Sequence, residues 1–249
     1  MRLNKYIAET GICSRREADR LIQERRVRVN GKEAQIGTTV EDGDEVRVDN
    51  RVVRAKTRGG AKVRVYIALN KPVGITCTTE RHVKGNIVDF VDHPERIYPI
   101  GRLDKDSEGL ILLTNDGDIV NEILRAENRH EKEYLVGVDR PVSDAFLAGM
   151  AGGVRLHEGV TQRCKVERIA KFGFRIVLTQ GLNRQIRRMC EAFEYNVQQL
   201  RRVRIDNVVL GNLRAGHWRN LTEAELSRLL PRNAPAARDE REPRRSRRG

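Results

Sequence analysis

Apolar and polar positions alternate with different periods along the chain, and the first 60 residues contain both helical and strand patterns. In the segment 14–23, apolar residues recur at helical spacing behind a Ser-x-x-Glu capping box. The segment 26–29 alternates arginine with valine, as a half-buried strand does, and Asn30-Gly31 follows as a turn signal. A second alternating segment, 46–48, comes after another turn. We therefore expect a small module of two helices followed by short strands.

Strand patterns outnumber helix patterns in the middle of the chain, and several follow one another directly. Strands are predicted at 63–69, 96–104, 109–115, 132–138, 164–170, 174–181 and 198–205, and helices at 117–126, 141–153, 183–193 and 221–230. Successive strands without an intervening helix favour antiparallel pairing. We therefore expect an α+β body around a mixed, mainly antiparallel sheet flanked by helices.

Composition divides the chain into three regions. Residues 1–60 form the basic module and residues 62–231 the α+β body, with Gly59-Gly60 as the expected hinge between them. Residues 232–249 are polar and rich in arginine, without periodic apolar positions, so we expect a disordered basic tail.

Charge and missing motifs narrow the class of function. The 48 Lys and Arg residues outnumber 35 Asp and Glu residues, which gives a net charge of +13 and favours RNA or DNA as the partner. The longest apolar run, near 110–113, is far too short to cross a membrane, and no secretory signal is visible, so we expect a cytoplasmic protein. The four cysteines form no CxxC pair, the five histidines no metal-ligand spacing, and no glycine-rich phosphate loop is present. No metal or cofactor is therefore expected.

Two segments carry candidate chemistry. In GRLDKDSEGLILLTNDG, residues 101–117, Asp104 stands where an apolar strand meets a polar loop, although an aspartate there can also be an ordinary turn or cap residue. The nearby carboxylates allow a metal-dependent ribonuclease as an alternative, and they are Asp104, Asp106 and Glu108, with Asp116 and Asp118 further on. In the helix 183–193, helical geometry places Arg187 at the edge of the apolar stripe and Arg188 nearly opposite, facing solvent or phosphate. An ordinary ion pair at the rim is the alternative for Arg187.

Four segments in order resemble the motifs of the pseudouridine synthases. They are LNKPVG at 69–74, GRLDKDSEGLILLTNDG at 101–117, KEYLV at 132–136 and GLNRQIRRM at 181–189. The first module resembles an S4 RNA-binding domain, and one subgroup of the synthases carries such a domain before the catalytic one. The resemblance implies an enzyme that isomerises a uridine in structured RNA. Because this reaction gains and loses no atom, it needs no redox or group-carrying cofactor.

The resemblance also implies roles for single residues. Asp104 matches the catalytic aspartate, Tyr134 the tyrosine that stacks on the target base, and Arg187 the basic residue that pairs with the catalytic carboxylate. Tyr134 can equally be a core residue of its strand. Arg102 matches the arginine that holds the place or the phosphate of the displaced nucleotide. Further RNA contacts are expected from the arginines Arg15, Arg16, Arg20, Arg26, Arg184 and Arg188.

Within the subgroup, the segment 115–136 is similar to synthases that modify the 23S rRNA and also a tyrosine tRNA. We therefore expect 23S rRNA as the partner, with a tRNA or a ribosomal precursor particle as further possibilities, no membrane association, and a monomer. A non-catalytic S4-containing RNA-binding or ribosome-assembly factor is the alternative of a different class. The retained Asp104, Tyr134 and Arg187 favour the enzyme.

Overall fold

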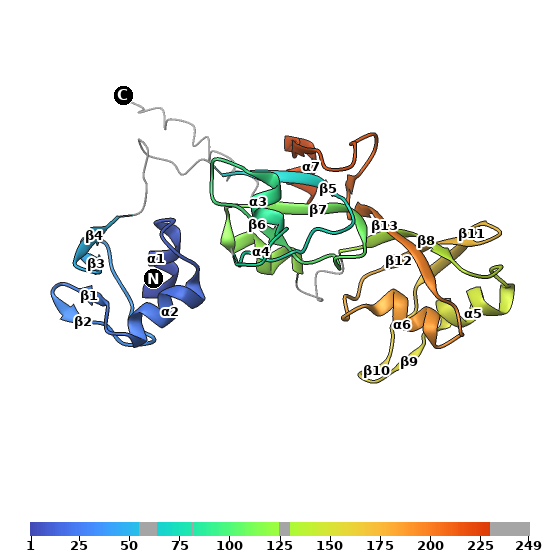
Figure 1. Ribbon diagram of the computed structural model, residues 1–249, viewed down its shortest axis with the longest axis horizontal. Helices are drawn as coiled ribbons and strands as arrows, with labels where there is room; N and C mark the ends of the chain where they lie inside the picture. The colour runs from blue at the N-terminus through green and yellow to red at the C-terminus, as the bar shows by residue number, and fades with distance from the viewer. Residues whose placement is uncertain (55–63, 81, 125–129, 230–249) are drawn as a thin grey trace, which may run out of the picture. The chain divides into compact units, whose positions relative to one another are not determined.

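The chain forms two compact units, Met1–Val63 and Arg64–Gly249, in the computed structural model (Figure 1). The structure describes residues 1–54, 64–80, 82–124 and 130–229. The predicted hinge at Gly59-Gly60 and the predicted tail at 232–249 lie outside the described residues. Each unit has its own hydrophobic core and is described by itself.

Unit 1 contains the predicted two helices followed by short strands. Its elements are α1 (Leu3–Glu9), α2 (Arg15–Gln23), β1 (Val27–Val29), β2 (Lys32–Glu33), β3 (Val46–Val48) and β4 (Arg51–Val53), and the strands pair antiparallel in the order β2-β1-β3-β4. The predicted capping box is present, because the Ser14 hydroxyl accepts a hydrogen bond of 3.1 Å from the backbone N–H of Glu17. Leu3, Ile7 and Ala18 are buried between the helices and this sheet.

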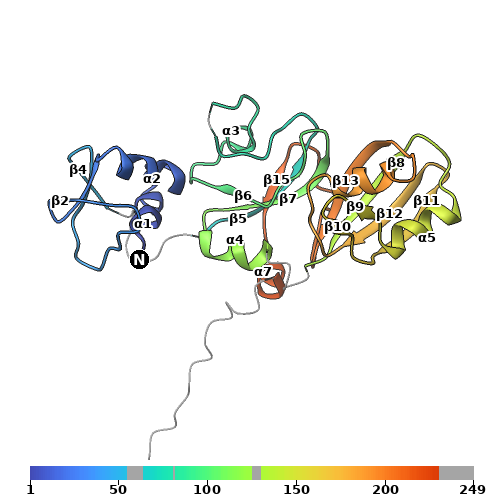
Figure 2. The same cartoon turned by 90° about the horizontal axis from the view of Figure 1, so that it is seen from below.

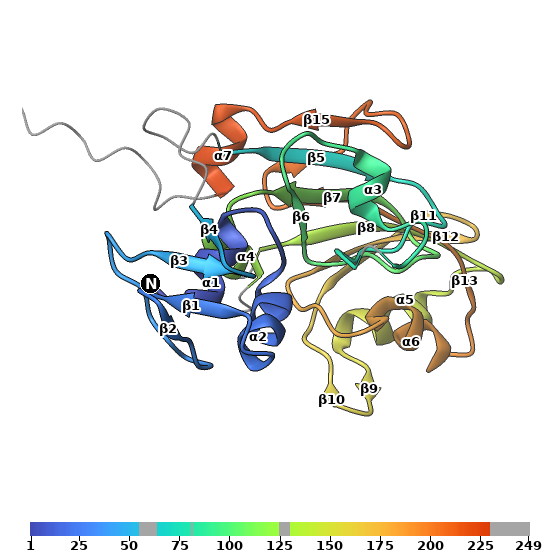
Figure 3. The same cartoon turned by 60° about the vertical axis from the view of Figure 1, so that its left-hand side comes forward.

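Unit 2 is built on one long mixed sheet. The strands of unit 2 are β5 (Tyr66–Lys71), β6 (Tyr98–Ile100), β7 (Glu108–Thr114), β8 (Lys132–Val138), β9 (Arg155–Leu156), β10 (Gly159–Val160), β11 (Lys165–Ala170), β12 (Gly173–Leu178), β13 (Val197–Ile205), β14 (Val208–Val209) and β15 (Trp218–Asn220). Of these, β9 and β10 form a separate two-stranded sheet. The helices of unit 2 are α3 (Ile87–Val91), α4 (Gly117–Leu124), α5 (Asp144–Gly152), α6 (Gln185–Glu191) and α7 (Glu223–Leu229). The sheet runs in the order β11-β12-β8-β13-β7-β5-β15, with β14 beside β13 and β6 beside β7, as Figure 3 shows for β15, β5 and β7. The pair β13–β7 is parallel and every other pair of named strands is antiparallel, so the predicted mixed, mainly antiparallel sheet is confirmed.

The part of the sheet formed by β5 and β7 is covered on both faces. Alternate residues of β7 point to opposite sides, so Leu110 and Leu112 pack with α4 and α7 while Ile111 and Leu113 pack with α3. Figure 2 shows α3 on one side of these strands and α4 and α7 on the other. This double coverage explains why β7 reads as an unbroken apolar run and not as an alternating one.

The other part of the sheet carries α5 and α6. The predicted apolar stripe of α6 is confirmed, because Ile186, Met189 and Cys190 are buried against the residues of β8 and β12. Phe193 packs there too, although the helix ends before it.

Several short elements escape the sequence patterns. These are α3, the hairpin of β9 and β10, and the edge strands β14 and β15. None is longer than five residues, so none completes the periodic repeat on which the prediction depends.

One glycine allows the parallel junction between β7 and β13 to form. Gly109 has φ +104°, and a Cβ atom there would lie 2.2 Å from the carbonyl oxygen of Arg202 and 2.7 Å from its nitrogen. A side chain at this position would therefore collide with the backbone of the neighbouring strand. The junction is also where the candidate site lies.

Candidate active site

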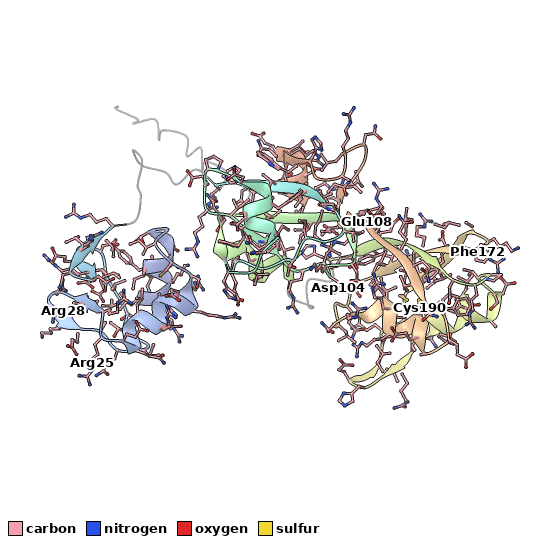
Figure 4. All side chains as sticks on the ribbon, viewed as in Figure 1. Arg25, Arg28, Asp104, Glu108, Phe172 and Cys190 are labelled. Carbon is pink, nitrogen blue, oxygen red and sulfur yellow. The ribbon has the colours of Figure 1, made fainter. Side chains whose placement is uncertain are left out.

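Asp104 lies in the turn that leads into β7, near the middle of unit 2 (Figure 4). The turn is fixed on both sides, because Leu103 N–H donates to Cys77 Sγ at 3.4 Å and Ser107 N–H donates to the Asp104 carbonyl at 3.1 Å. The Asp104 side chain is 31% exposed, and its nearest cation is Arg184 Nη1 at 4.0 Å. Its carboxylate accepts no hydrogen bond from the described residues, so it does not act as a turn or helix cap within them. A partly exposed carboxylate that accepts no hydrogen bond from the described residues is better suited to react with a substrate than to stabilise the fold.

The partner of Arg187 differs from the one that the resemblance implies. Arg187 pairs with Asp106 and not with Asp104: its Nη2 lies 3.2 Å from Asp106 Oδ2 and also donates to the Asp106 carbonyl at 3.1 Å. Its Nη1 donates to the Val197 carbonyl at 3.2 Å, and its side chain is only 9% exposed. Arg187 pairs with Asp106 in preference to Asp104 because both the carboxylate and the carbonyl oxygen of Asp106 face its guanidinium group. Arg187 is thus a buried arginine that joins α6, β13 and the turn of Asp104, and not a pair at the rim.

Arg184 reaches the same carboxylates from the start of α6. Its backbone has φ +48°, a left-handed conformation that residues other than glycine adopt rarely, at the N-cap of the helix. Its Nη1 lies 3.4 Å from both carboxylate oxygens of Asp106 and 4.0 Å from Asp104 Oδ2. Arg184 is therefore the arginine that stands beside Asp104.

Arg188 is less available to phosphate than its helical position predicts. Its Nη1 donates to both oxygens of Glu158 at 3.0 and 2.8 Å, in the hairpin of β9 and β10. These hydrogen bonds hold the pKa of the Glu158 carboxyl below its usual range. The helix wheel could not anticipate this, because the hairpin is an element that the sequence does not reveal.

Tyr134 lies on β8 and is partly buried between two hydrophobic clusters. One is formed with α5 and α6, and the other contains Leu103 and Cys77 beside the turn of Asp104. Its hydroxyl lies 3.5 Å from Nη1 of Arg202, and the guanidinium carbon of Arg202 lies 5.9 Å from the centre of its ring. Tyr134 thus belongs both to the core and to the neighbourhood of Asp104.

Two buried cations complete this neighbourhood, and the sequence analysis missed both. Lys71 is fully buried, and its Nζ donates to the carbonyls of Pro72 and Ile75 at 2.9 Å each. Burial lowers the pKa of Lys71, while the nearby carboxylates, Asp104 among them, act in the opposite direction. Arg202 is 4% exposed. Lys71 is a charged residue directly after an apolar strand pattern, and that was the available signal, whereas the arginine-rich strand of Arg202 gave none.

The arginines of unit 1 differ in how free they are to bind phosphate. Arg15 and Arg16 are exposed and have no partner among the described residues. Arg20 pairs with Glu17 at 2.5 Å, and Arg26 binds both oxygens of Asp49 at 2.7 Å. In unit 2, Arg102 is exposed and also unpartnered within the described part of the chain.

The described residues contain neither a cluster of metal-binding side chains nor a membrane-spanning helix. No group of three or more His, Cys, Asp or Glu side chains there could hold a metal ion. No helix among them is long and apolar enough to cross a membrane.

Comparisons with known proteins match this arrangement. Residues 65–192 match the family described as RNA pseudouridylate synthase, and residues 1–46 match the S4 domain. The dual-specificity RNA pseudouridine synthase RluF of Salmonella typhi is 60% identical over 229 residues, covering 92% of this chain and 78% of the relative. The same-named enzyme of Escherichia coli (strain K12) is 58% identical over 230 residues with the same coverage. Ribosomal large subunit pseudouridine synthase B of Bacillus subtilis (strain 168) is 35% identical over 237 residues, covering 92% and 95%.

A solved structure agrees with these relatives. A crystal structure of a pseudouridylate synthase superposes with a TM-score of 0.68 at 30% identity, covering 92% of this chain and all of the other. The matches confirm the family expected from the four motifs and the S4 region expected from the first module, and they favour an enzyme over a non-catalytic binding factor. The chain belongs to the RNA pseudouridylate synthase family, in the branch that carries an S4 domain, and it isomerises uridine in RNA.

Proposed function

We propose that this enzyme modifies one specific uridine of 23S rRNA and also a uridine of a tRNA, with Asp104 as the catalytic residue, Tyr134 and Arg187 beside it, and no cofactor. The observation that carries the proposal is the placement of Asp104. Its carboxylate is partly exposed, accepts no hydrogen bond from the described residues, lies 4.0 Å from Arg184 Nη1 and acts electrostatically on Lys71. It also directly follows Leu103, which belongs to the cluster that Tyr134 packs against. The double specificity is proposed by analogy with the dual-specificity RNA pseudouridine synthases that are 58–60% identical.

The reaction explains why a carboxylate is needed. The N1–C1′ bond of the uridine breaks, the uracil turns, and C5 bonds to C1′. C5 then loses its proton and N1 gains one, so that no atom is gained or lost overall. Cleavage leaves positive charge on the ribose, the kind of centre that glycosidases stabilise with carboxylates. Asp104 would act on it either by adding to C1′ or by directing removal of the C2′ proton.

The target base must leave its stack to reach Asp104, which costs a few kcal/mol. Stacking on Tyr134 would recover about 1–3 kcal/mol of this cost. Arg102 is exposed two residues before Asp104 and would fill the place of the base or hold its phosphate. Arg187 would act by holding Asp106 and, through it, the turn of Asp104.

Docking of the RNA would depend on charge more than on aromatic stacking, since aromatic residues make up only 4% of the chain. Arg15 and Arg16 are free to contact phosphate, while Arg20, Arg26, Arg184 and Arg188 would have to exchange a carboxylate for a phosphate. We also propose that residues 1–60 bind the RNA, that 62–231 catalyse, that the basic 232–249 adds non-specific attachment, and that the enzyme is a cytoplasmic monomer.

The experiment incubates wild type and Asp104→Asn with transcripts of 23S rRNA and of tyrosine tRNA, and maps pseudouridine by chemical labelling. A single new site in each RNA, made by wild type and not by the variant, is the expected result. A site made equally well by both proteins would refute the role of Asp104. Modification of neither RNA by wild type would refute the proposed substrates, and the same assay on precursor particles would then identify the target.

A further inference from the structure

Arg202 is a buried cation without a counter-charge. It lies on β13 between β7 and β8, opposite Gly109 on one side and Tyr134 on the other. Its Nε donates to the Leu110 carbonyl at 2.7 Å, but Nη2 is buried and has no hydrogen-bond partner among the described residues. No carboxylate within them pairs with its guanidinium group.

An unpaired charge in this position costs stability. Buried charges are ordinarily paired, because removing an ion from water costs several kcal/mol that only a good partner offsets. Arg204, two residues further along the same strand, follows the ordinary rule: Nε donates to Glu133 at 2.8 Å and Nη2 to Glu131 at 2.9 Å. The contrast with Arg204 indicates that Arg202 contributes to the function of the enzyme and not to the stability of the fold.

The surroundings of Arg202 point to Tyr134. The guanidinium group reaches both the hydroxyl and the ring of that residue, at 3.5 and 5.9 Å. Its charge also acts on Cys77, whose thiol accepts the hydrogen bond from Leu103 next to Asp104. Arg202 therefore contacts Tyr134 and also acts on the Cys77 thiol beside the turn of Asp104.

We propose that Arg202 is a positioning residue that fixes the ring and the hydroxyl of Tyr134 for the isomerisation. The inference rests on the stacking role proposed above for Tyr134, to which it adds a role of the Tyr134 hydroxyl in the removal of the C5 proton. The direction of the hydrogen bond decides how the hydroxyl is oriented. A guanidinium group has donors only, so Tyr134 Oη must be the acceptor. The hydroxyl proton then points away from Arg202, and the hydroxyl is presented to the substrate in one orientation. The target uracil, which stacks on the ring and loses a proton from C5, meets a hydroxyl already held in place.

The positive charge of Arg202, which no described carboxylate neutralises, also suits the charge that the reaction creates. When the glycosidic bond breaks, the electron pair stays on the uracil, so the base becomes anionic as the ribose becomes cationic. A fixed positive charge close to the ring on which that base stacks stabilises the anion in a site with little water.

The test uses the full-length enzyme and makes the same substitution at two arginines of one strand. Arg202→Lys keeps the charge and loses the planar guanidinium group, and Arg204→Lys makes the same change at an arginine that binds Glu133 and Glu131. A third variant, Arg202→Met, removes the buried charge that has no carboxylate partner among the described residues. Each is made in wild type and in Tyr134→Phe, and kcat, KM and the unfolding temperature are measured. Because Arg202 lacks a carboxylate partner, Arg202→Met should unfold at a temperature no lower than Arg204→Lys does.

The inference predicts that Arg202→Lys and Arg202→Met lower kcat at least about tenfold, which is less than the roughly 10²–10⁴-fold that a proton-transfer group itself contributes, because Arg202 only positions that group. It predicts a KM within about threefold of wild type and little further loss in the Tyr134→Phe background, because the hydroxyl that Arg202 holds is then absent. Arg204→Lys should leave kcat nearly unchanged. Two results would overturn this inference and leave the role of Tyr134 standing. One is a double variant whose loss of kcat is the product of the losses in the Arg202 and Tyr134 single variants. The other is an equal loss of kcat in the Arg202 and Arg204 variants. Normal turnover by Tyr134→Phe would overturn the role proposed for the Tyr134 hydroxyl and the inference with it.

Discussion

Alanine at position 109 would test the parallel junction that holds the candidate site together. The new Cβ would lie 2.2, 2.7 and 3.0 Å from the O, N and C atoms of Arg202, and backbone atoms of a central strand cannot move aside as a flexible side chain can. The backbone of Gly109, with φ +104°, adds strain for any other residue.

The structure sets the magnitude of this loss. An unfavourable backbone conformation costs about 1–3 kcal/mol and overpacking a core another 1–3 kcal/mol, so Gly109→Ala should lose roughly 2–6 kcal/mol. At ~2–4 °C per kcal/mol for a unit of this size, the unfolding temperature should fall by roughly 5–20 °C.

The assay is thermal unfolding followed by circular dichroism, with Gly152→Ala as the matched control. Gly152 ends α5 without a left-handed backbone, and a Cβ there meets nothing within 4 Å, so the control should unfold like wild type. A fall of less than about 2 °C for Gly109→Ala would refute the argument that the junction requires a glycine.

Three further predictions concern the rest of the molecule. Burial raises the pKa of the Cys190 thiol to about 12, so the native protein should leave Cys190 unalkylated at pH 8.5, and its modification by iodoacetamide in mass spectrometry would contradict this. Replacing Arg15 and Arg16 with alanine should reduce the slope of log K against log salt for RNA binding by about 1 for each lost phosphate contact, and an unchanged slope would exclude them as contacts. The hydrogen bonds from Arg219 lower the pKa of Glu225, so their stabilisation is present above pH 4.5 and is lost as the pH falls through the lower folded value. Urea unfolding should therefore show Glu225→Gln weaker than wild type by about 1 kcal/mol at pH 7, with a difference that shrinks as the pH is lowered below 4.5, and a constant difference would refute the linkage.

Local patterns predicted those elements whose burial depends on neighbours close in sequence. The strand 132–138 was expected with the bounds that β8 has, since its apolar residues face one core and turn signals flank it. The helix α2 begins where its capping box predicts. By contrast, α3 and the hairpin of β9 and β10 are stabilised by packing and by the Arg188–Glu158 contact, which come from distant parts of the chain.

The candidate site shows the same division. The motif order was enough to single out Asp104 and Tyr134, which the fold brings to the edges of the same hydrophobic cluster. Arg187 pairs with Asp106 because the turn directs both the carboxylate and the carbonyl of Asp106 toward its guanidinium group. The spacing of residues along a helix does not predict the conformation of such a turn. Arg202 escaped notice because a run of arginines in a strand looks exposed until the register of the sheet shows which of them is buried.

The most direct test of the account compares the single-turnover rates of Asp104→Asn and Asp106→Asn on the RNA that wild type modifies. The two substitutions remove the same charge two residues apart, and only Asp106 makes the hydrogen bonds of an ordinary structural carboxylate among the described residues. We predict no detectable pseudouridine with Asp104→Asn, and slower but measurable formation with Asp106→Asn, while both bind the RNA like wild type. Turnover by Asp104→Asn at a rate equal to or above that of Asp106→Asn would contradict the claim that Asp104 carries the reaction.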